Sequence, residues 1–321
     1  MDIVGLGMAT VDVLVRLHEM PTWQAGARLG DLALDGGGPV GTALAAASRL
    51  GAQTGFIGVA GDDRLARLKL ESLREHGVDT SRVVVQPHRE SQVVVCYVHA
   101  KTGERVFCGH EHFSSHQLCA ADLDRAYVTA ARCLHLDGSH IRAARQAARW
   151  MREAGRQVVL DLSTTRKAPS PECRALVADV DVLIAGSGAV PALTGESDLW
   201  AAAAAALALG PAVVVQTEGA DGSYTVTREE RFHTPAFDVQ VVDTTGAGDV
   251  FHGAYIFGLL QEWDLRRTAS FASAAAALNC TRFGGRAGAP TLEEVEEFQH
   301  LRSAAAVPFV ATSESEGRSR V

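Results

Sequence analysis

The 321-residue sequence lacks the features of disulfide-rich, zinc-stabilised and nucleic-acid-binding proteins. Its six cysteines form no Cys-x-x-Cys pair, and their scattered spacing fits neither a disulfide framework nor a structural zinc site. The formal net charge of −8 argues against a basic face for nonspecific nucleic-acid binding. We therefore expect most of the cysteines to be small core residues in a reducing compartment, with no nucleic-acid partner.

Long hydrophobic runs are also missing. The amino-terminal residues carry no basic segment followed by an apolar stretch, so no signal peptide is expected. The longest apolar run, Leu199 to Leu209, is rich in alanine and too short to span a bilayer. It predicts a buried or half-buried helix, and the chain is expected to be cytoplasmic and without a membrane partner.

The sequence is rich in glycine, alanine and valine and poor in aromatic residues, which make up 6% of the chain. Short apolar runs alternate with helical patterns, an arrangement that predicts βαβ units and a buried parallel sheet. The expected strands are Ile3–Leu6, Thr54–Val59, Cys133–Leu136, Gln157–Leu162, Val180–Ala185 and Val213–Gln216. The expected helices are Ala43–Leu50, Leu65–His76, Ile141–Ala154, Leu199–Leu209 and Arg267–Cys280.

Two stretches break this alternation and predict antiparallel hairpins with one solvated face. One pairs Val11–Leu17 with Ala27–Leu34, and the other pairs Gln92–His99 with Glu104–Gly109. They could meet in space as a small second sheet that covers a substrate or pairs with another subunit.

The most specific stretch of the chain is Asp243-Thr244-Thr245-Gly246-Ala247-Gly248-Asp249, followed by an apolar helical pattern from Val250. A turn of small residues at a helix N-terminus exposes backbone N–H groups and so offers a site for an anion. Asp249 is an unsuitable residue for merely holding phosphate, but it suits a base that takes the proton of an attacking hydroxyl. The turn alone is equally compatible with a loop whose Asp caps a helix.

The full string resembles the signature Asp-Thr-x-Gly-Ala-Gly-Asp-x-Phe of the ribokinase-like (PfkB) carbohydrate kinases. The resemblance implies a three-layer α/β/α sandwich with a mostly parallel central sheet and a small β-sheet lid. The kinase domain would cover residues 1–310, with the lid from about 12–35 and 88–110 and a disordered tail at 311–321. It also implies an ATP- and Mg²⁺-dependent transfer of phosphate, with Asp249 as base and Gly246, Ala247 and Gly248 as anion hole.

A second set of motifs resembles the sugar-binding side of these kinases. Gly36-Gly37-Gly38-Pro39-Val40-Gly41-Thr42 stands where the family has Gly-Gly-x-x-x-Asn, so Thr42 replaces the usual Asn. Small residues let a ligand approach the backbone, and the Asp12 carboxylate can accept hydrogen bonds from vicinal hydroxyls. The residues expected to hold the sugar are Asp12, Gly37, Gly38, Thr42 and Ser139.

The nucleotide side is indicated by Thr217-Glu218-Gly219-Ala220-Asp221-Gly222, which resembles the family loop Thr-x-Gly-x-x-Gly. Such a loop at the carboxyl end of a strand lies where open α/β sheets bind ligands. The resemblance implies that Thr217, Gly219, Gly222 and Asn279 border the nucleotide. It also implies a monovalent cation site, which K⁺ could fill, at Asp243, Thr245, Cys280 and Gly285.

One family motif is missing. Most ribokinase-like enzymes carry Asn-x-x-Glu, whose Glu organises the magnesium and phosphate region, whereas this chain has Gly186 and Ala189 at those positions. Magnesium would then depend on ATP phosphates, water and other carboxylates. The chain either belongs to a subgroup without the motif or has reduced activity. Its combined motifs resemble the sulfofructose kinase branch. A sulfonate group needs a positively charged partner, which Arg28, Arg89 or Arg105 could supply.

The sequence therefore predicts an ATP-dependent kinase that phosphorylates a primary hydroxyl of a sugar or sugar derivative: a ketose, a sulfosugar or a sugar phosphate. Two alternatives stay open. One is a nucleoside kinase of the same fold, although few aromatic residues flank the expected pocket. The other is a noncatalytic sugar or nucleotide sensor, and the missing Asn-x-x-Glu motif favours this alternative. A homodimer through the lid is also expected.

Overall fold

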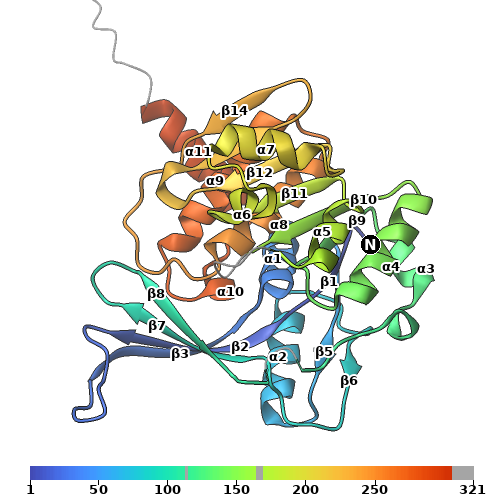
Figure 1. The fold of residues 1–321 in the computed structure, drawn as a ribbon. Helices are drawn as coiled ribbons and strands as arrows, with labels where there is room; N and C mark the ends of the chain where they lie inside the picture. Colours follow the sequence, from blue (N-terminus) through green and yellow to red (C-terminus); the bar gives the residue numbers. More distant parts are fainter. Residues whose placement is uncertain (113–114, 164–168, 306–321) are drawn as a thin grey trace, which may run out of the picture.

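The computed structural model describes residues 1–112, 115–163 and 169–305, so the tail predicted at 311–321 lies outside the described residues. Runs of branched aliphatic residues, buried along their whole length, form the central sheet (Figure 1). Within the described residues it has eight strands, in the spatial order β14 (Arg231–Thr234), β13 (Ser223–Val226), β12 (Val213–Thr217), β11 (Val182–Ala185), β10 (Gln157–Leu162), β9 (Cys133–Leu136), β1 (Ile3–Leu6) and β4 (Thr54–Ile57).

The six strands from β12 to β4 are parallel, whereas β13 and β14 are antiparallel additions at one edge. All six strands expected for this sheet are present, which confirms the predicted fold class. The two antiparallel strands were not predicted from the sequence, because Ser223–Val226 and Arg231–Thr234 are short and half polar.

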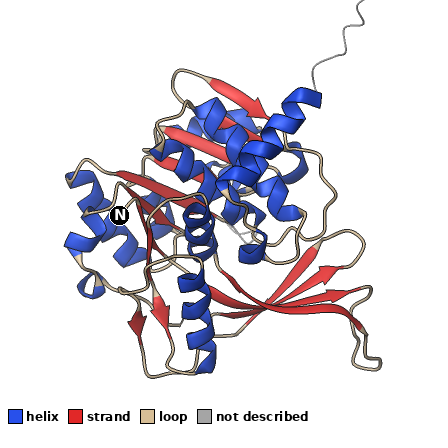
Figure 2. Cartoon of the chain, turned by 180° about the vertical axis from the view of Figure 1, so that it is seen from behind, coloured by secondary structure: helices blue, strands red, loops and turns tan. Residues whose placement is uncertain are grey.

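Helices cover both faces of the sheet (Figure 2). One layer packs on the first hydrophobic cluster and consists of α3 (Arg125–Thr129), α4 (Ile141–Glu153), α5 (Pro171–Val177), α6 (Ala189–Thr194) and α7 (Leu199–Leu207). The opposite layer contributes to the second cluster and consists of α1 (Pro39–Arg49), α2 (Arg64–Glu75), α8 (Ala247–Leu260), α9 (Leu265–Cys280) and α11 (Leu292–Ala305). A short helix, α10 (Gly285–Gly288), and a two-stranded sheet of β5 (Val59–Ala60) and β6 (Val84–Val85) complete the body.

A separate four-stranded sheet projects from one side of this body (Figures 1 and 2). Its spatial order is β3 (Leu29–Gly37), β2 (Thr10–Leu17), β7 (Val93–His99) and β8 (Arg105–Gly109). The pairs β2–β3 and β7–β8 are antiparallel, and β2 pairs with β7 in parallel. The prediction that two distant hairpins meet in one small sheet is therefore confirmed, and we call this sheet the lid.

The two faces of the lid differ in burial. Leu14, Cys96 and Val98 are buried against Phe283 of the body. The opposite, outer face exposes large apolar side chains on the edge strands β3 and β8: Leu29, Leu32, Leu34 and Val106. Phe107 is also exposed, but it pairs with Cys96 and so lies on the inner face.

The helix of the Asp249 motif begins earlier than the apolar pattern predicts. Gly246 has φ +71°, a left-handed conformation that ends the preceding turn, so the helix already starts at Ala247 instead of Val250. None of the helices in the described ranges has the length and hydropathy needed to cross a membrane.

Candidate active site

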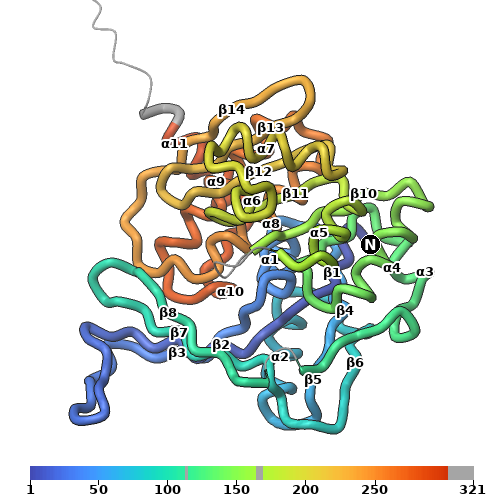
Figure 3. Tube along the Cα trace, in the orientation of Figure 1, coloured from blue at the N-terminus to red at the C-terminus, as the bar shows by residue number. Residues whose placement is uncertain are grey.

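Polar side chains gather where the parallel strands end, because the carboxyl ends of such strands meet at one edge of the sheet. Asp137 follows β9, Asp161 lies near the end of β10, and Thr217 ends β12. The trace leaves β1 at this edge and continues directly into β2 of the lid, which carries Asp12 (Figure 3). The edge of the central sheet and the root of the lid therefore border the same region.

The Gly246–Asp249 turn forms the first turn of α8. The N–H groups of Gly248 and Asp249 occupy positions with no acceptor inside the helix, and the helix dipole adds positive potential there. A Cβ on Gly246 would lie 2.8 Å from Cα of Gly285, so this close approach also requires glycine. The N–H of Ala247, by contrast, donates to the carbonyl of Thr244 over 3.3 Å. Anion binding at this turn stays a prediction, which the N–H groups of Gly248 and Asp249 favour.

Asp249 lies in a region of concentrated negative charge. Asp249 is half-buried; the partial desolvation of its carboxyl group, followed by the charge of Asp161, raises its pKa to about 8, while Arg105 acts in the opposite direction. Burial likewise raises the pKa of Asp161 to about 7. A carboxyl group with such a pKa is a stronger base than an ordinary aspartate, as proton abstraction from an alcohol requires.

Asp161 is paired with an uncharged partner. The Nε2 atom of His252 lies 3.8 Å from Oδ1 of Asp161, and Ser163 Oγ donates to the same oxygen over 2.8 Å. Burial lowers the pKa of His252 to about 3, so the ring is neutral at physiological pH. His252 therefore leaves the negative charge of Asp161 uncompensated when that carboxyl is ionised.

Asp12 and the glycine loop pack tightly together on the lid side. Thr10 Oγ1 donates to Asp12 Oδ1 over 2.5 Å, and burial raises the pKa of Asp12 to about 6. A Cβ on Gly37 would lie 2.1 Å from Asp12 Oδ2, so glycine is required there. The structure therefore brings Asp12, Gly37 and Gly38 together as predicted.

Arg286 fixes the position of the glycine loop through a hydrogen bond. Its side chain is fully buried, and Nη2 donates to the carbonyl oxygen of Gly37 over 2.5 Å while Nη1 donates to Ser72 Oγ over 3.1 Å. Burial lowers its pKa to about 10, so it remains charged at neutral pH and offsets part of the charge of Asp12. No role was predicted for Arg286 from the sequence.

Thr42 and Ser139, the other residues expected to hold the sugar, differ in their surroundings. Thr42 is fully buried on α1, and its hydroxyl oxygen has no hydrogen-bond partner. Ser139 lines a cavity of about 370 Å³, and its backbone N–H donates to Asp137 Oδ1 over 2.9 Å. Ser139 therefore borders open space, whereas Thr42 does not, and contact with a sugar stays a prediction for both residues.

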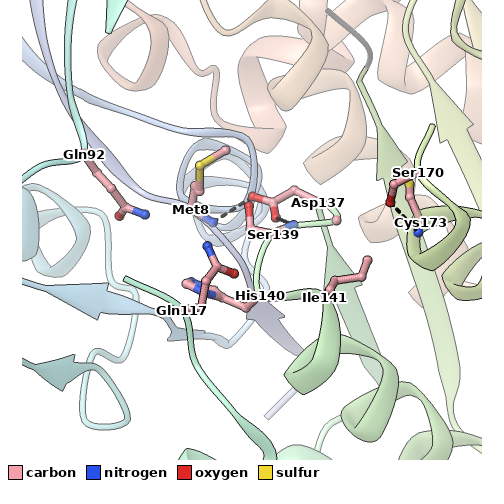
Figure 4. Close-up of a pocket in the computed structure, with 10 residues that line it drawn as sticks. Met8, Gln92, Gln117, Asp137, Ser139, His140, Ile141, Ser170 and Cys173 are labelled. Carbon is pink, nitrogen blue, oxygen red and sulfur yellow. Dashed lines mark hydrogen bonds between the residues drawn. The ribbon is translucent and has the colours of Figure 1, made fainter. Parts of the chain in front are cut away.

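Asp137 also lines that cavity, between Met8 and Ser139 (Figure 4). Its Oδ2 also accepts from the N–H of Met8 over 2.7 Å, which fixes the carboxylate against the start of the lid. Sequence reasoning did not assign Asp137 or Asp161, although each stands at the end of a predicted parallel strand. That position was the signal that could have found them.

The predicted nucleotide side consists mainly of loops at the ends of β11 and β12, whose glycines leave the backbone accessible. Thr217 Oγ1 donates to the carbonyl of Ala185 over 3.3 Å, which ties the predicted loop to the end of β11. Ser187 Oγ donates to Glu218 Oε2 over 2.5 Å across the same two strand ends. Open space surrounds the Cα atoms of several glycines here, so that a ligand could approach their backbone: Gly186, Gly188, Gly219 and Gly248.

Gly222 and Asn279, the other residues expected to border the nucleotide, occupy closed positions. Gly222 has φ +90°, and a Cβ on it would lie 2.1 Å from the carbonyl oxygen of Thr234. Asn279 is fully buried and its Nδ2 donates to the carbonyl of Thr245 over 2.9 Å. Asn279 thus supports the catalytic turn from behind, and contact with a nucleotide stays a prediction for both residues.

The residues expected to hold a monovalent cation lie together behind the turn. The carboxylate of Asp243 accepts from the N–H groups of Thr245 and Gly284 over 2.8 and 3.0 Å. The carbonyl of Cys280 accepts from the N–H of Val242 over 2.8 Å. Gly285 packs against Gly246. The Cys280 carbonyl also accepts from the N–H of Asp243 over 3.3 Å, which uses its second lone pair, whereas the Asp243 carboxylate retains lone pairs. A cation at this place stays a prediction.

The lid contacts the segment that leads into the turn. Arg105 Nη1 donates to Thr244 Oγ1 over 2.6 Å, and Thr244 Oγ1 in turn donates to the carbonyl of Gly103 over 3.1 Å. Arg105 lowers the pKa of Asp249, so its positive charge acts at the catalytic turn. The sequence named Arg105 only as a candidate for binding a sulfonate.

Comparison with known proteins settles the family. Residues 7–292 match the model of the pfkB family of carbohydrate kinases. The chain belongs to this family. Membership confirms the predicted class, an ATP-dependent carbohydrate kinase.

Two relatives and one solved structure illustrate the similarity. The chain is 26% identical to 5-dehydro-2-deoxygluconokinase of Shouchella clausii, over 94% of this chain and 97% of the relative. It is 30% identical to aminoimidazole riboside kinase of Salmonella typhimurium, over 80% and 86% of the two chains. The structure of Arabidopsis thaliana ribokinase complexed with ribose and ATP superposes with a TM-score of 0.79 at 23% identity, covering 92% of this chain and 98% of that one.

Proposed function

We propose that this family member transfers the γ-phosphoryl group of ATP to a primary hydroxyl of a sugar or sugar derivative. The observation that carries the proposal is the position of Asp249 on the first turn of α8, next to N–H groups that have no acceptor inside the helix. The pKa of its carboxyl group is raised to about 8, and the charges of Asp12 and Asp137 contribute to this shift. The base, the anion hole and the polyol-binding side thus border one region.

In this proposal Asp249 takes the proton of the acceptor hydroxyl as that oxygen bonds to the γ-phosphorus and the bond to the departing ADP breaks. The N–H groups of the Gly246–Gly248 turn and the Arg105 guanidinium face the charge that develops on the transferred group. Asp12, Gly37, Gly38 and Thr42 orient the sugar, and the lid excludes water.

The nucleotide side fits Mg²⁺-ATP. Its open glycines leave room for phosphates against the backbone, and Thr217 and Gly219 border that room. Among the residues that the structure describes, no cluster of three or more His, Cys, Asp or Glu could hold a metal ion. Mg²⁺ would therefore bind mainly through nucleotide phosphates and water, as it commonly does, and would neutralise charge on the phosphates. A need for K⁺ stays a prediction.

The identity of the acceptor is part of the proposal. Relatives are named for a dehydrodeoxygluconate and for aminoimidazole riboside, so a sugar acid and a nucleoside both belong to the panel to be tested. Phosphosugars and the sulfosugars of the predicted sulfofructose kinase branch complete it. The riboside kinase relative is the observation that keeps a nucleoside acceptor as the second candidate.

The test is ADP release from Mg-ATP over a panel of neutral sugars, sugar acids, phosphosugars, sulfosugars and nucleosides, with Asp249→Asn measured beside the wild type. We expect turnover with one class of acceptor and a kcat about 10²- to 10⁴-fold lower in the variant, because the proton acceptor is removed. Near-full activity of Asp249→Asn would reject Asp249 as the base. ATP binding without turnover of any acceptor would favour a sensor.

We also propose a homodimer through the outer face of the lid. Its support is the row of exposed apolar side chains on the edge strands β3 and β8, which a second copy could cover. Light scattering that gives the mass of one chain at micromolar concentration would reject the dimer. The cytoplasmic location stays a prediction from the sequence.

A further inference from the structure

We propose that Gln92 is a specificity-determining residue of the acceptor site, whose side-chain amide nitrogen donates a hydrogen bond to an oxygen atom of the sugar. The inference rests on the function proposed above and goes beyond it, because it assigns a recognition contact to a residue that no sequence motif singled out.

Gln92 stands at the junction between the body and the lid. It immediately precedes β7, and its carbonyl accepts from the N–H of Val11 on β2 over 3.0 Å, so the backbone is fixed on the strand that also carries Asp12. Only 3% of the residue is exposed. Its side chain nevertheless lines the same cavity as Met8 and Asp137, with the amide group directed into it (Figure 4).

A buried lysine determines which end of the amide faces the cavity. Lys69 on α2 is fully buried, and its Nζ donates to Gln92 Oε1 over 3.1 Å. An ammonium group can only donate, so the atom that faces it must be the amide oxygen. The –NH₂ end is consequently the end that is left for a ligand.

The lysine has no freedom to release this contact. Its three donors are used by Gln92, by the carbonyl of Val59 at 2.9 Å and by Glu90 Oε2 at 2.6 Å. Glu90 is itself held by the N–H groups of Gly61 and Gln92 over 3.2 and 2.9 Å. In this buried network the Lys69 ammonium and both oxygens of the Glu90 carboxylate have partners, so the amide of Gln92 is held in place by its oxygen and is preorganised.

The cavity therefore presents a fixed donor and a fixed acceptor. The donor is the amide nitrogen of Gln92, and the acceptor is the carboxylate of Asp137, which still has lone pairs beyond its two backbone contacts. A sugar hydroxyl can accept from the first and donate to the second. A site built in this way rejects an analogue that lacks the oxygen, because the buried donor is then left unpaired.

The experiment compares Gln92→Ala and Gln92→Glu with the wild type, and Gln146→Ala serves as a matched control on α4, in a separate surface hollow. The probes are D-ribose with 2-deoxy-D-ribose, and D-fructose with 2,5-anhydro-D-mannitol, which lacks the anomeric hydroxyl of fructofuranose. They are compared in ADP-release assays and in ligand-observed NMR binding. Gln92→Glu keeps the size of the side chain and its contact with Lys69 but removes the donor.

We expect both Gln92 variants to raise the KM or Kd of the sugar by about 10- to 100-fold, with the Kd of ATP unchanged. The preference of the wild type between an oxygenated sugar and its deoxygenated partner should also shrink in both variants. Gln146→Ala should match the wild type in each assay.

Three results would overturn the inference: sugar affinities that are unchanged in both variants, a Gln92→Glu variant that behaves like the wild type while Gln92→Ala does not, or a wild type that binds ATP but none of the sugars. The second result would assign Gln92 a packing role. Failure of the kinase proposal looks different, because the sugars would then bind and discriminate between the variants without any transfer of phosphate.

Discussion

The two sides of the candidate active site are built by different means. The acceptor side consists of charged side chains that are buried, except for the half-buried Asp137: Asp12, Asp137, Arg286 and the Lys69–Glu90 pair next to Gln92. The nucleotide side consists of turns with open space around their glycines and with few fixed side chains. The acceptor side is therefore preorganised by contacts between side chains, whereas the nucleotide side is formed by the backbone of its turns.

This difference matches what each ligand needs. A sugar offers only hydroxyl oxygens, so recognition depends on donors and acceptors held at fixed positions. Phosphates can be held by main-chain N–H groups, which any sequence provides once the turn is formed. Substitutions on the acceptor side should therefore have large effects, whereas matched substitutions on the nucleotide side should be tolerated.

The largest effect is expected from breaking the buried ion pair. Lys69→Met leaves the Glu90 carboxylate buried without its cation, which should lower the free energy of unfolding by about 3–5 kcal/mol in urea denaturation. Ser187→Ala removes the contact with Glu218 on the nucleotide side, where both groups are near solvent, and should change stability by no more than about 0.5 kcal/mol. Equal losses in the two variants would contradict the comparison.

A pair of glycine substitutions gives the next largest effect. Gly37→Ala forces a methyl group against Asp12 Oδ2, so the carboxylate must move, and kcat/KM for the acceptor should fall about 100-fold. Gly186→Ala places its methyl group in open space and should leave kcat/KM within about twofold of the wild type. A 100-fold loss of kcat/KM in Gly186→Ala as well would contradict the comparison, because the backbone of the two sides would then be equally constrained.

The smallest effect concerns pH. The active form of Asp249 is the carboxylate, so kcat/KM should fall as the pH drops through about 8, the pKa of this group in the free enzyme. Of the charges that act on it, Asp161, Asp12 and Asp137 raise this pKa and Arg105 lowers it. Asp161→Asn removes the strongest of these charges, and the acid limb of the pH profile should move about one unit lower. An unmoved limb would exclude Asp161 as a modulator of the base.

The sequence was sufficient to predict the parts of the fold with strong local patterns. The parallel strands, the two lid hairpins and the turn before Asp249 follow from apolar periodicity and glycine placement. The strands β13 and β14 were missed because their short, half-polar runs have no distinct pattern.

The site was predictable only where a motif marked it. Asp12, Gly37 and Asp249 belong to such motifs. Gln92 and Lys69 do not: each is a single polar residue in an unremarkable stretch, and their contact depends on how α2 packs against the root of the lid. Tertiary packing alone makes these two residues a pair, so no local signal could have shown it.

The raised pKa values of Asp12, Asp161 and Asp249 also bear on stability. The folded chain holds protons that an unfolded chain has already released, so these groups reduce stability as the pH rises from about 4 to about 8. A ligand that favours the ionised carboxylates must expel those protons on binding. Its affinity should therefore increase with pH over this range, and its binding enthalpy should depend on the ionisation enthalpy of the buffer.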